Sequence, residues 1–197
     1  MIKLETGDLN WLVGLIEGEG SFIINASVRD GGVGFCPYLR IVLSEKDRET
    51  VFLIKKMLGF GRIEFKSNEI WKRKGMNNVQ NQYSYTISGV IAAQKFIENF
   101  GENLFRTSKK EDFVLWKKAI EIIKNYRHLT YEGFVNICEI RDKMNLKQKR
   151  KNYRDKNWFL NYIRKNENFF SEKNIQKRKR TSISIRRLNN IELSMRS

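Results

Sequence analysis

The chain has 197 residues, of which 41% are apolar, and this is enough to bury the core of one globular domain. Two cysteines and one histidine exclude a disulfide framework, a four-thiolate zinc site and catalysis by paired histidines, so that any bound metal would have oxygen ligands. Lysine and arginine (38) outnumber the acidic residues (22), and the formal charge of +16 indicates a polyanionic partner such as nucleic acid. Because no run of about 18 apolar residues and no signal-peptide-like N-terminus is present, we expect a soluble, intracellular protein without a membrane partner.

The first predicted element is a helix over residues 8–18 that is apolar on two opposite faces. Two stripes at helical spacing share the helix: Leu9, Leu12, Val13 and Ile16 on one face, and Trp11, Gly14, Leu15 and Gly18 on the other. A surface helix has one apolar stripe, so two stripes indicate contacts on both sides. The alternative is that the glycines fray the helix end, which explains Gly18 better than Gly14. The spacing of the two glycines predicts close contact with a second helix.

Two strand–strand–helix units follow this helix. Polar and apolar residues alternate over residues 22–29, 38–44, 62–66 and 82–88, which is typical of strands with one buried face. Helices are predicted over residues 47–58, capped by Asp47, and over 90–100. A capping box of Ser108 and Glu111 predicts another helix, and a further one is expected over 131–144. The pattern predicts an α+β fold with a four-stranded antiparallel sheet, helices on one face and a polar, partly basic second face.

The positive charge is concentrated near the C-terminus. Residues 142–197 contain 17 basic and 5 acidic residues, a net charge of +12, and have weak apolar periodicity. We therefore predict a domain over residues 1–145 and a basic, partly disordered extension over residues 146–197. One interpretation of this extension is a tail that only improves solubility. The other is a segment that docks or folds on nucleic acid, since aromatic residues are interleaved with the charges: Trp158, Phe159, Tyr162, Phe169 and Phe170.

Two acidic residues, Glu17 and Glu19, fall at the C-terminal end of the first helix, where the helix dipole disfavours each by about 0.3–1 kcal/mol. A divalent cation reverses this preference, and carboxylates together with the Gly18 carbonyl are hard ligands suited to Mg²⁺. If the glycine face pairs two copies of the helix, two acids converge and can activate water for attack on a phosphodiester. The alternative is an ordinary solvated helix end.

The sequence LVGLIEGEGSF at residues 12–22 closely resembles the signature of the LAGLIDADG homing endonucleases. A second stretch, LFRTSKKEDF at residues 104–113, resembles the C-terminal half of such domains, and the resemblance covers residues 8–145. It implies an αββαββα fold whose saddle-shaped sheet lies in the DNA major groove. No second copy of the motif is found in the sequence, so the chain resembles the single-motif members, which are homodimers.

The resemblance also implies roles for individual residues. The metal-binding acid of the family falls on Glu19, with the Gly18 carbonyl beside it, and the metal is expected to be Mg²⁺. Glu17 matches a position that is more often structural. The basic residue near the scissile phosphate best matches Lys109, with Lys110 as the competing choice, and Glu45 falls where a polar residue orders active-site water.

The dimer interface is expected at Trp11, Gly14, Leu15 and Gly18. Outward-facing strand residues are expected to contact the bases: Asn25, Ser27, Arg29, Tyr38, Arg40, Arg62, Glu64, Lys66, Gln82, Ser84 and Thr86. Val42 is in the same row but could contact only a thymine methyl group.

Three alternatives to a DNA endonuclease remain. One is a splicing maturase that binds intron RNA, and another is a nonenzymatic DNA-binding regulator on the same scaffold. The third, a restriction-type nuclease, rests only on the short pattern Glu64-Phe65-Lys66. Abundant Asn, Lys and Ile with scarce Pro are typical of an AT-rich genome. Together with the mobile introns in which the resembled family usually occurs, this leads us to expect an organellar protein, from a mitochondrion before a chloroplast, that is made inside the organelle.

Overall fold

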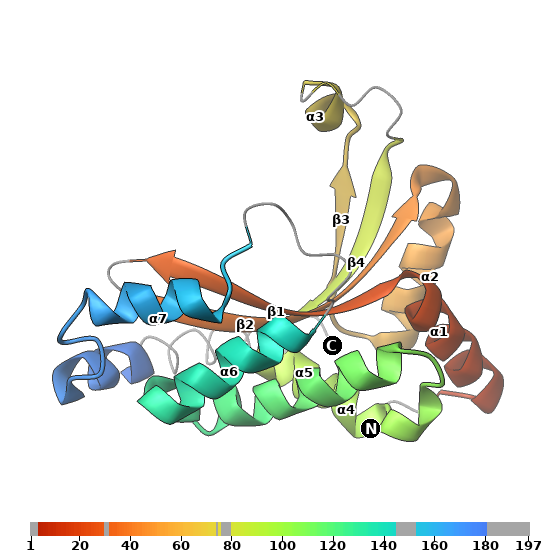
Figure 1. The fold of residues 1–197 in the computed structure, drawn as a ribbon. Helices are drawn as coiled ribbons and strands as arrows, with labels where there is room; N and C mark the ends of the chain where they lie inside the picture. The colour runs from red at the N-terminus through yellow and green to blue at the C-terminus, as the bar shows by residue number, and fades with distance from the viewer. Residues whose placement is uncertain (1–3, 30–31, 74, 76–79, 145–152, 181–197) are drawn as a thin grey trace.

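The computed structural model describes residues 4–29, 32–73, 75, 80–144 and 153–180 (Figure 1). Its helices and strands follow the chain in this order: α1 (Thr6–Glu19), β1 (Gly20–Arg29), β2 (Gly32–Ser44), the 3-10 turn η1 (Glu45–Asp47), α2 (Arg48–Leu58), β3 (Arg62–Lys66), the one-turn α3 (Glu69–Lys72), β4 (Gln82–Ser88), α4 (Val90–Asn99), η2 (Glu102–Leu104), α5 (Lys109–Lys124), η3 (Arg127–Leu129), α6 (Tyr131–Lys143) and α7 (Lys156–Arg164). Residues 172–180 are also helical.

The four strands form one antiparallel sheet in the order β1-β2-β4-β3. Figure 1 shows a strongly curved sheet, with α4, α5 and α6 lying together on one side of it. The α+β class, the four antiparallel strands and the helix-covered face predicted from the sequence are confirmed. The sequence did not predict α3 between β3 and β4.

Strand alternation sets which face is buried. In β2, Leu39 and Ile41 are fully buried, whereas Arg40 between them is half-buried on the opposite face. An aromatic cluster fills the space between the buried face and the helices, with Phe22 of β1 and Trp116 of α5 at its centre, 5.1 Å apart between ring centroids. Aromatic pairs at such distances add to the free energy of burial, so this cluster fixes α5 against β1.

Asp47 and Ser108 are the N-cap residues of α2 and α5, as predicted, but neither makes the expected side-chain cap. Asp47 lies in a 3-10 turn before α2 and makes no side-chain cap; its carboxylate instead accepts a hydrogen bond from the Ser44 hydroxyl at 2.8 Å. Ser108 already has helical backbone angles, so its hydroxyl does not cap α5, and the neighbouring Thr107 hydroxyl accepts the Lys109 amide at 3.3 Å. In each case the residue is in the N-cap position, but its side chain does not accept an amide of the first helical turn.

The described part of the C-terminal segment packs on the domain. Phe159 and Ile163 of α7, together with Phe169, are almost completely buried and belong to the main hydrophobic core. Ring contacts join Phe159 to Phe35 of β2 and to Phe134 of α6. Of the five aromatic residues considered as nucleic-acid contacts, Phe159 and Phe169 are therefore core residues. Residues 145–152 and 181–197 of the predicted extension lie outside the described residues.

Within the described ranges, no helix has both the length and the apolar character needed to cross a lipid bilayer.

Candidate metal and nucleic-acid site

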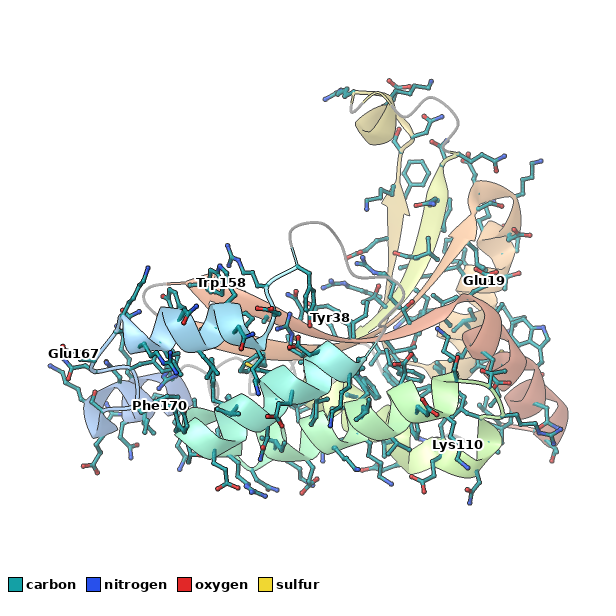
Figure 2. The ribbon with its side chains drawn as sticks, viewed as in Figure 1. Glu19, Tyr38, Lys110, Trp158, Glu167 and Phe170 are labelled. Atoms are coloured by element: carbon teal, nitrogen blue, oxygen red, sulfur yellow. The ribbon has the colours of Figure 1, made fainter. Side chains whose placement is uncertain are left out.

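The carboxylate of Glu19 lies at the junction of α1 and β1. Glu19 is exposed, and within the described residues it makes no hydrogen bond or ion pair. Figure 2 shows it where the C-terminal end of α1 meets the sheet. The neighbouring Gly18 carbonyl has no partner inside the helix, because Phe22, the residue four positions on, already belongs to β1. Two oxygen donors are thus available at the negative end of the helix dipole.

These donors fit a Mg²⁺ ion that is completed by other groups. No cluster of three or more His, Cys, Asp or Glu residues that could hold a metal occurs among the described residues. Mg²⁺ commonly uses one or two carboxylates, substrate phosphate oxygens and several waters rather than an all-protein cage. Glu19 and the Gly18 carbonyl suit this role, and a second copy of the chain would supply a second carboxylate.

Glu17, the other acid of the helix end, has a different environment. Its Oε1 atom accepts the backbone amides of Arg106 at 2.6 Å and of Thr107 at 2.7 Å. These hydrogen bonds, with that from Thr107 as the larger cause, hold the pKa of the Glu17 carboxyl below its ordinary value. Glu17 therefore connects the end of α1 to the segment that leads into α5, in agreement with the structural role that the resemblance implied.

The two candidate lysines are the first two residues of α5. Lys109 is half-buried in its first turn, where the Thr107 hydroxyl accepts its amide, whereas Lys110 is exposed. In Figure 2, Lys110 lies on the helix layer, away from the sheet region where Glu19 and Tyr38 are labelled. Both lysines follow the segment that Glu17 holds, so this segment connects the start of α5 to the end of α1.

Glu45 begins η1 directly after β2 and is held by a residue that the sequence did not single out. The Asn81 side-chain amide donates to Glu45 Oε2 at 2.8 Å, and the Glu45 amide donates to the Asn81 carbonyl at 3.0 Å. Asn81 Oδ1 in turn accepts the Asn68 amide at 2.7 Å. Asn81 immediately precedes β4, and a polar residue at a strand start is too common a feature to have identified it.

The strand register brings the predicted base-contacting residues onto one face. Arg62 pairs with Thr86, which pairs on its other side with Arg40; Glu64 and Ser84 follow in the next row, and Lys66 and Gln82 in the next. On the other pair of strands, Asn25, Ser27 and Tyr38 lie on the same face by alternation. Arg29 ends β1, but its side chain lies outside the described residues.

Two members of this set support arginines rather than face a ligand. Glu64 accepts Arg40 Nη2 at 3.0 Å and Arg62 Nε at 2.8 Å. Thr86 is fully buried, and its hydroxyl accepts Arg40 Nε at 3.3 Å. The expectation that Thr86 faces the bases is therefore not met, because it lies under Arg40. These contacts leave both Nη groups of Arg62, in the planar fork that suits a guanine edge, and the Nη1 group of Arg40 for a ligand.

Tyr38 and Cys36 extend this face toward β1. Burial is the main cause that raises the pKa of each group, so both the phenol and the thiol stay protonated at neutral pH. A neutral Tyr38 hydroxyl is a hydrogen-bond donor and acceptor and adds no negative charge to the face. The alternation of β2 could have identified Cys36, which lies in the same row as Tyr38 and Arg40.

The second apolar stripe of α1 is uncovered in the single chain. Trp11 is 41% exposed, and a side chain placed at Gly14 or Gly18 would meet no atom of the described chain within 4 Å. Leu15 is half-buried, whereas Leu12 and Ile16 on the opposite stripe are fully buried. The fold thus covers one stripe and leaves Trp11, Gly14 and Gly18 of the other exposed.

A model of the LAGLIDADG endonuclease family matches residues 12–120, which run from α1 into α5. The chain belongs to the LAGLIDADG endonuclease family. The match includes Glu17, Gly18, Glu19 and Lys109 and all four strands of the sheet.

Curated relatives of this LAGLIDADG chain are named as fungal intron-encoded endonucleases. Probable intron-encoded endonuclease 4 of Neurospora crassa is 35% identical over 112 residues, which cover 57% of this chain and 17% of that protein. Probable intron-encoded endonuclease Cox1-I1b of Schizosaccharomyces pombe is 25% identical over 166 residues, which cover 81% of this chain and 40% of that protein. The chain thus spans less than half the length of these relatives.

Solved structures have the same LAGLIDADG fold. An archaeal intron-encoded homing endonuclease complexed with DNA, I-Vdi141I, is 27% identical with a TM-score of 0.67, and the match covers 82% of this chain and 98% of that chain. The LAGLIDADG meganuclease I-AabMI, bound to uncleaved DNA, is 28% identical with a TM-score of 0.58, and the match covers 70% of this chain and 44% of that chain. The fold therefore occurs both alone and as about half of a longer chain.

Proposed function

We propose that the chain is a site-specific double-strand DNA endonuclease that hydrolyses phosphodiester bonds with Mg²⁺, as a homodimer, at a long pseudo-palindromic site. The observation that carries this proposal is the unpaired, exposed Glu19 carboxylate at the end of a helix whose second apolar stripe is uncovered. Two copies that pair through Gly14 and Gly18 would bring two such carboxylates to one place. A protein that only bound DNA would have no use for this pair.

The polar sheet face supports duplex DNA as the substrate. It combines fixed arginines, such as Arg40 and Arg62, with short polar side chains, on a chain of charge +16. Phosphate contacts by basic residues supply affinity, and hydrogen bonds to base edges in the major groove supply selectivity. The solved structures of I-Vdi141I and I-AabMI, which are of complexes with DNA, agree with this choice.

Each site residue then has a role in hydrolysis. When bound, Mg²⁺ would polarise the phosphodiester and help to ionise the attacking water. Glu19 and the Gly18 carbonyl hold the ion, and Glu17 keeps the start of α5 against this helix end. Lys109 stabilises the charge that develops on the phosphate oxygens. Glu45, held by Asn81, accepts a hydrogen bond from the water that attacks.

The homodimer proposal rests on one signature helix in this chain and on a solved relative of one-domain size. The match covers 98% of the I-Vdi141I chain, so that chain has the size of one LAGLIDADG unit. An organellar origin, in a mitochondrion before a chloroplast, is proposed from the AT-rich residue usage and from fungal relatives named as intron-encoded.

The test is cleavage of a randomised duplex DNA library in the presence of Mg²⁺. The native protein is compared with Glu19→Gln, and with Glu5→Gln as the control at the other end of α1. We expect the native protein and the control to cut one long, nearly palindromic site, and Glu19→Gln to bind that site without cutting it.

The remaining outcomes identify the alternatives. If neither the native protein nor the control cuts any DNA while both bind a structured intron RNA tightly, the maturase alternative replaces the endonuclease. If they select a duplex site but never cut it, the chain is a DNA-binding regulator. Cutting by Glu19→Gln at the native rate would contradict the assigned metal ligand.

A further inference from the structure

Helix α7 and the residues before it carry a row of stacked side chains that takes no part in the proposed active site. The Arg154 guanidinium lies 4.3 Å from the centroid of the Trp158 ring, and Trp158 stacks on Tyr162 with centroids 5.5 Å apart and planes within 8°. Trp158 is 37% exposed, although large apolar side chains are usually buried. Helical spacing adds exposed Lys165 to the same stripe. We call these four residues, Arg154, Trp158, Tyr162 and Lys165, the α7 stripe.

The α7 stripe is held rigidly beside the sheet. The Arg141 guanidinium of α6 donates to the Ile24 carbonyl of β1 at 2.9 Å and to the Arg154 carbonyl at 3.3 Å. Asp142 accepts the Tyr153 hydroxyl at 3.0 Å and the Lys156 amide at 2.9 Å. Since β1 is an edge strand, these bonds attach the start of α7 to the free edge of the sheet, next to Asn25.

The stripe continues the polar face of the sheet outward. Figure 1 shows α7 at the end of the β1–β2 hairpin that is farthest from α1. In Figure 2, Trp158 is labelled on α7, beside the hairpin whose strand β2 carries Tyr38. A duplex that lay on the polar face with its centre near α1 would therefore pass α7 beyond the outer end of the sheet.

The charge of the segment suits a polyanion. Residues 153–180 contain nine basic and three acidic residues. Within the described chain, Arg154, Arg164 and Lys165 have no carboxylate partner, whereas Lys156 is paired with Glu139 at 3.1 Å. Charges that the fold does not neutralise remain available for phosphates.

The geometry of the stripe favours duplex backbone over unpaired bases. Arg154 and Tyr162 both contact the ring of Trp158, at 4.3 Å and 5.5 Å from its centroid. A nucleobase from a single strand, whose usual contact is stacking on an aromatic face, would compete with these two groups for the ring. The ring edges and the cationic ends of Arg154 and Lys165 are left, and these suit the sugar–phosphate backbone.

We propose that the α7 stripe is a second DNA-binding surface, which binds the sugar–phosphate backbone of the duplex just outside the site recognised by the sheet. This rests on the proposed endonuclease function and adds a contact that lengthens the DNA each protomer binds. The contact increases affinity without base selectivity, because phosphates carry no sequence information.

The test compares two duplexes that contain the selected site. The short duplex ends at the boundary of the site, and the long one extends it by about one helical turn on each side. The variant Arg154→Gln/Lys165→Gln removes two charges, and neither side chain makes a hydrogen bond or ion pair within the described chain. Lys95→Gln/Lys118→Gln, exposed on α4 and α5, is the charge-matched control.

We expect the native protein and the control to bind the long duplex about tenfold more tightly than the short one. The α7 variant should lose this gain. It should still bind and cut the short duplex as the native protein does. The slope of log affinity against log salt on the long duplex should fall by about one for each phosphate that the variant no longer neutralises. Trp158→Ala should shorten the hydroxyl-radical footprint at its outer ends.

Equal affinity of the α7 variant and the native protein for the long duplex would overturn the proposal, as would an equal loss on both duplexes. Failure of the native protein to select any short duplex would instead contradict the endonuclease function, and the flanking contact with it. The affinity of the native protein for the short duplex thus distinguishes the two failures.

Discussion

The Glu17 carboxylate and the Thr107 backbone amide, 90 positions apart in the sequence, are joined by a hydrogen bond of 2.7 Å. With the companion bond from the Arg106 amide, it fixes the start of α5 to the end of α1. Glu19 lies two residues after Glu17, and Lys109 two residues after Thr107. One acid of the helix end thus holds the scaffold, and the other, the proposed metal ligand, is exposed.

Replacement of Glu17 tests this assignment. We expect Glu17→Ala to lower the free energy of unfolding by about 1 kcal/mol, because two amides lose a charged acceptor at a partly exposed site. The cleavage rate should fall as well, since Lys109 is no longer held. Urea unfolding followed by fluorescence measures the first effect, and Glu5→Ala is the control. A variant with native stability would show that the two amides do not depend on Glu17.

The same hydrogen bonds predict a pH dependence. The folded state lowers the pKa of Glu17, so the stabilisation is present above the ordinary carboxyl pKa and is lost as the pH falls through the lowered value. The difference in unfolding free energy between the native protein and Glu17→Ala should therefore be full at neutral pH and shrink in acid. Urea titrations at a series of pH values give this difference, and a gap that widens in acid would have the wrong sign.

The two lysines at the start of α5 should differ in their effect on the reaction. We expect Lys109→Ala to lower the single-turnover cleavage rate about a hundredfold, the usual loss when one group that stabilises a developing oxyanion is removed. Lys110→Ala removes the same charge from an exposed position on the helix layer and should leave the rate nearly unchanged. The reverse order of the two rates would assign the role to Lys110.

The sequence predicted the sheet well because strand alternation is a local property. Leu39 and Arg40 point to opposite faces whatever lies around them, and the pattern survives in the structure. Burial of Thr86 beneath Arg40 depends on a neighbouring strand, and the caps at Asp47 and Ser108 depend on the turns before them. Local patterns carry no information on such contacts.

The same limit explains the C-terminal segment. The sequence allows each aromatic residue among the charges to be either a core residue or a nucleic-acid contact. Only the tertiary contacts show that Phe159 and Phe169 are buried, whereas Trp158 is exposed. The proposed metal site is predicted by the motif at residues 12–22 rather than by the spacing of its acidic residues. The described residues contain no cluster of three or more His, Cys, Asp or Glu that would mark a metal centre. The hydrogen bonds of Asn81 to Glu45 and of Glu17 to Arg106 join residues far apart in the sequence, so only the fold shows them.

Glu64 should control selectivity rather than affinity. It orients Arg40 and Arg62, so Glu64→Ala frees both guanidinium groups to adopt other rotamers. We expect discrimination at the base pairs under these arginines to fall about tenfold, while affinity for unrelated DNA stays equal or rises because a negative charge is removed. Sequencing of cleaved library members measures the first effect. Glu98→Ala, which removes an exposed charge on α4, is the control, and an unchanged selection profile would contradict the role.

Replacement of Gly14 by alanine should affect the stability of the single chain and that of the dimer in opposite directions. A methyl group at this position meets no atom within 4 Å, so Gly14→Ala should stabilise α1 in the isolated chain by about 1 kcal/mol through helix propensity. If Gly14 faces the same helix of a second copy, the methyl group separates the two backbones, and the dissociation constant of the dimer should increase roughly tenfold or more.

Sedimentation equilibrium across a dilution series measures the dissociation constant of the dimer, and thermal unfolding at low concentration measures the stability of the single chain. Gly101→Ala, which is equally open but lies outside α1, should change neither property by much. A Gly14→Ala protein that dimerises as tightly as the native one would move the interface away from the glycine stripe, and with it the convergence of the two Glu19 carboxylates.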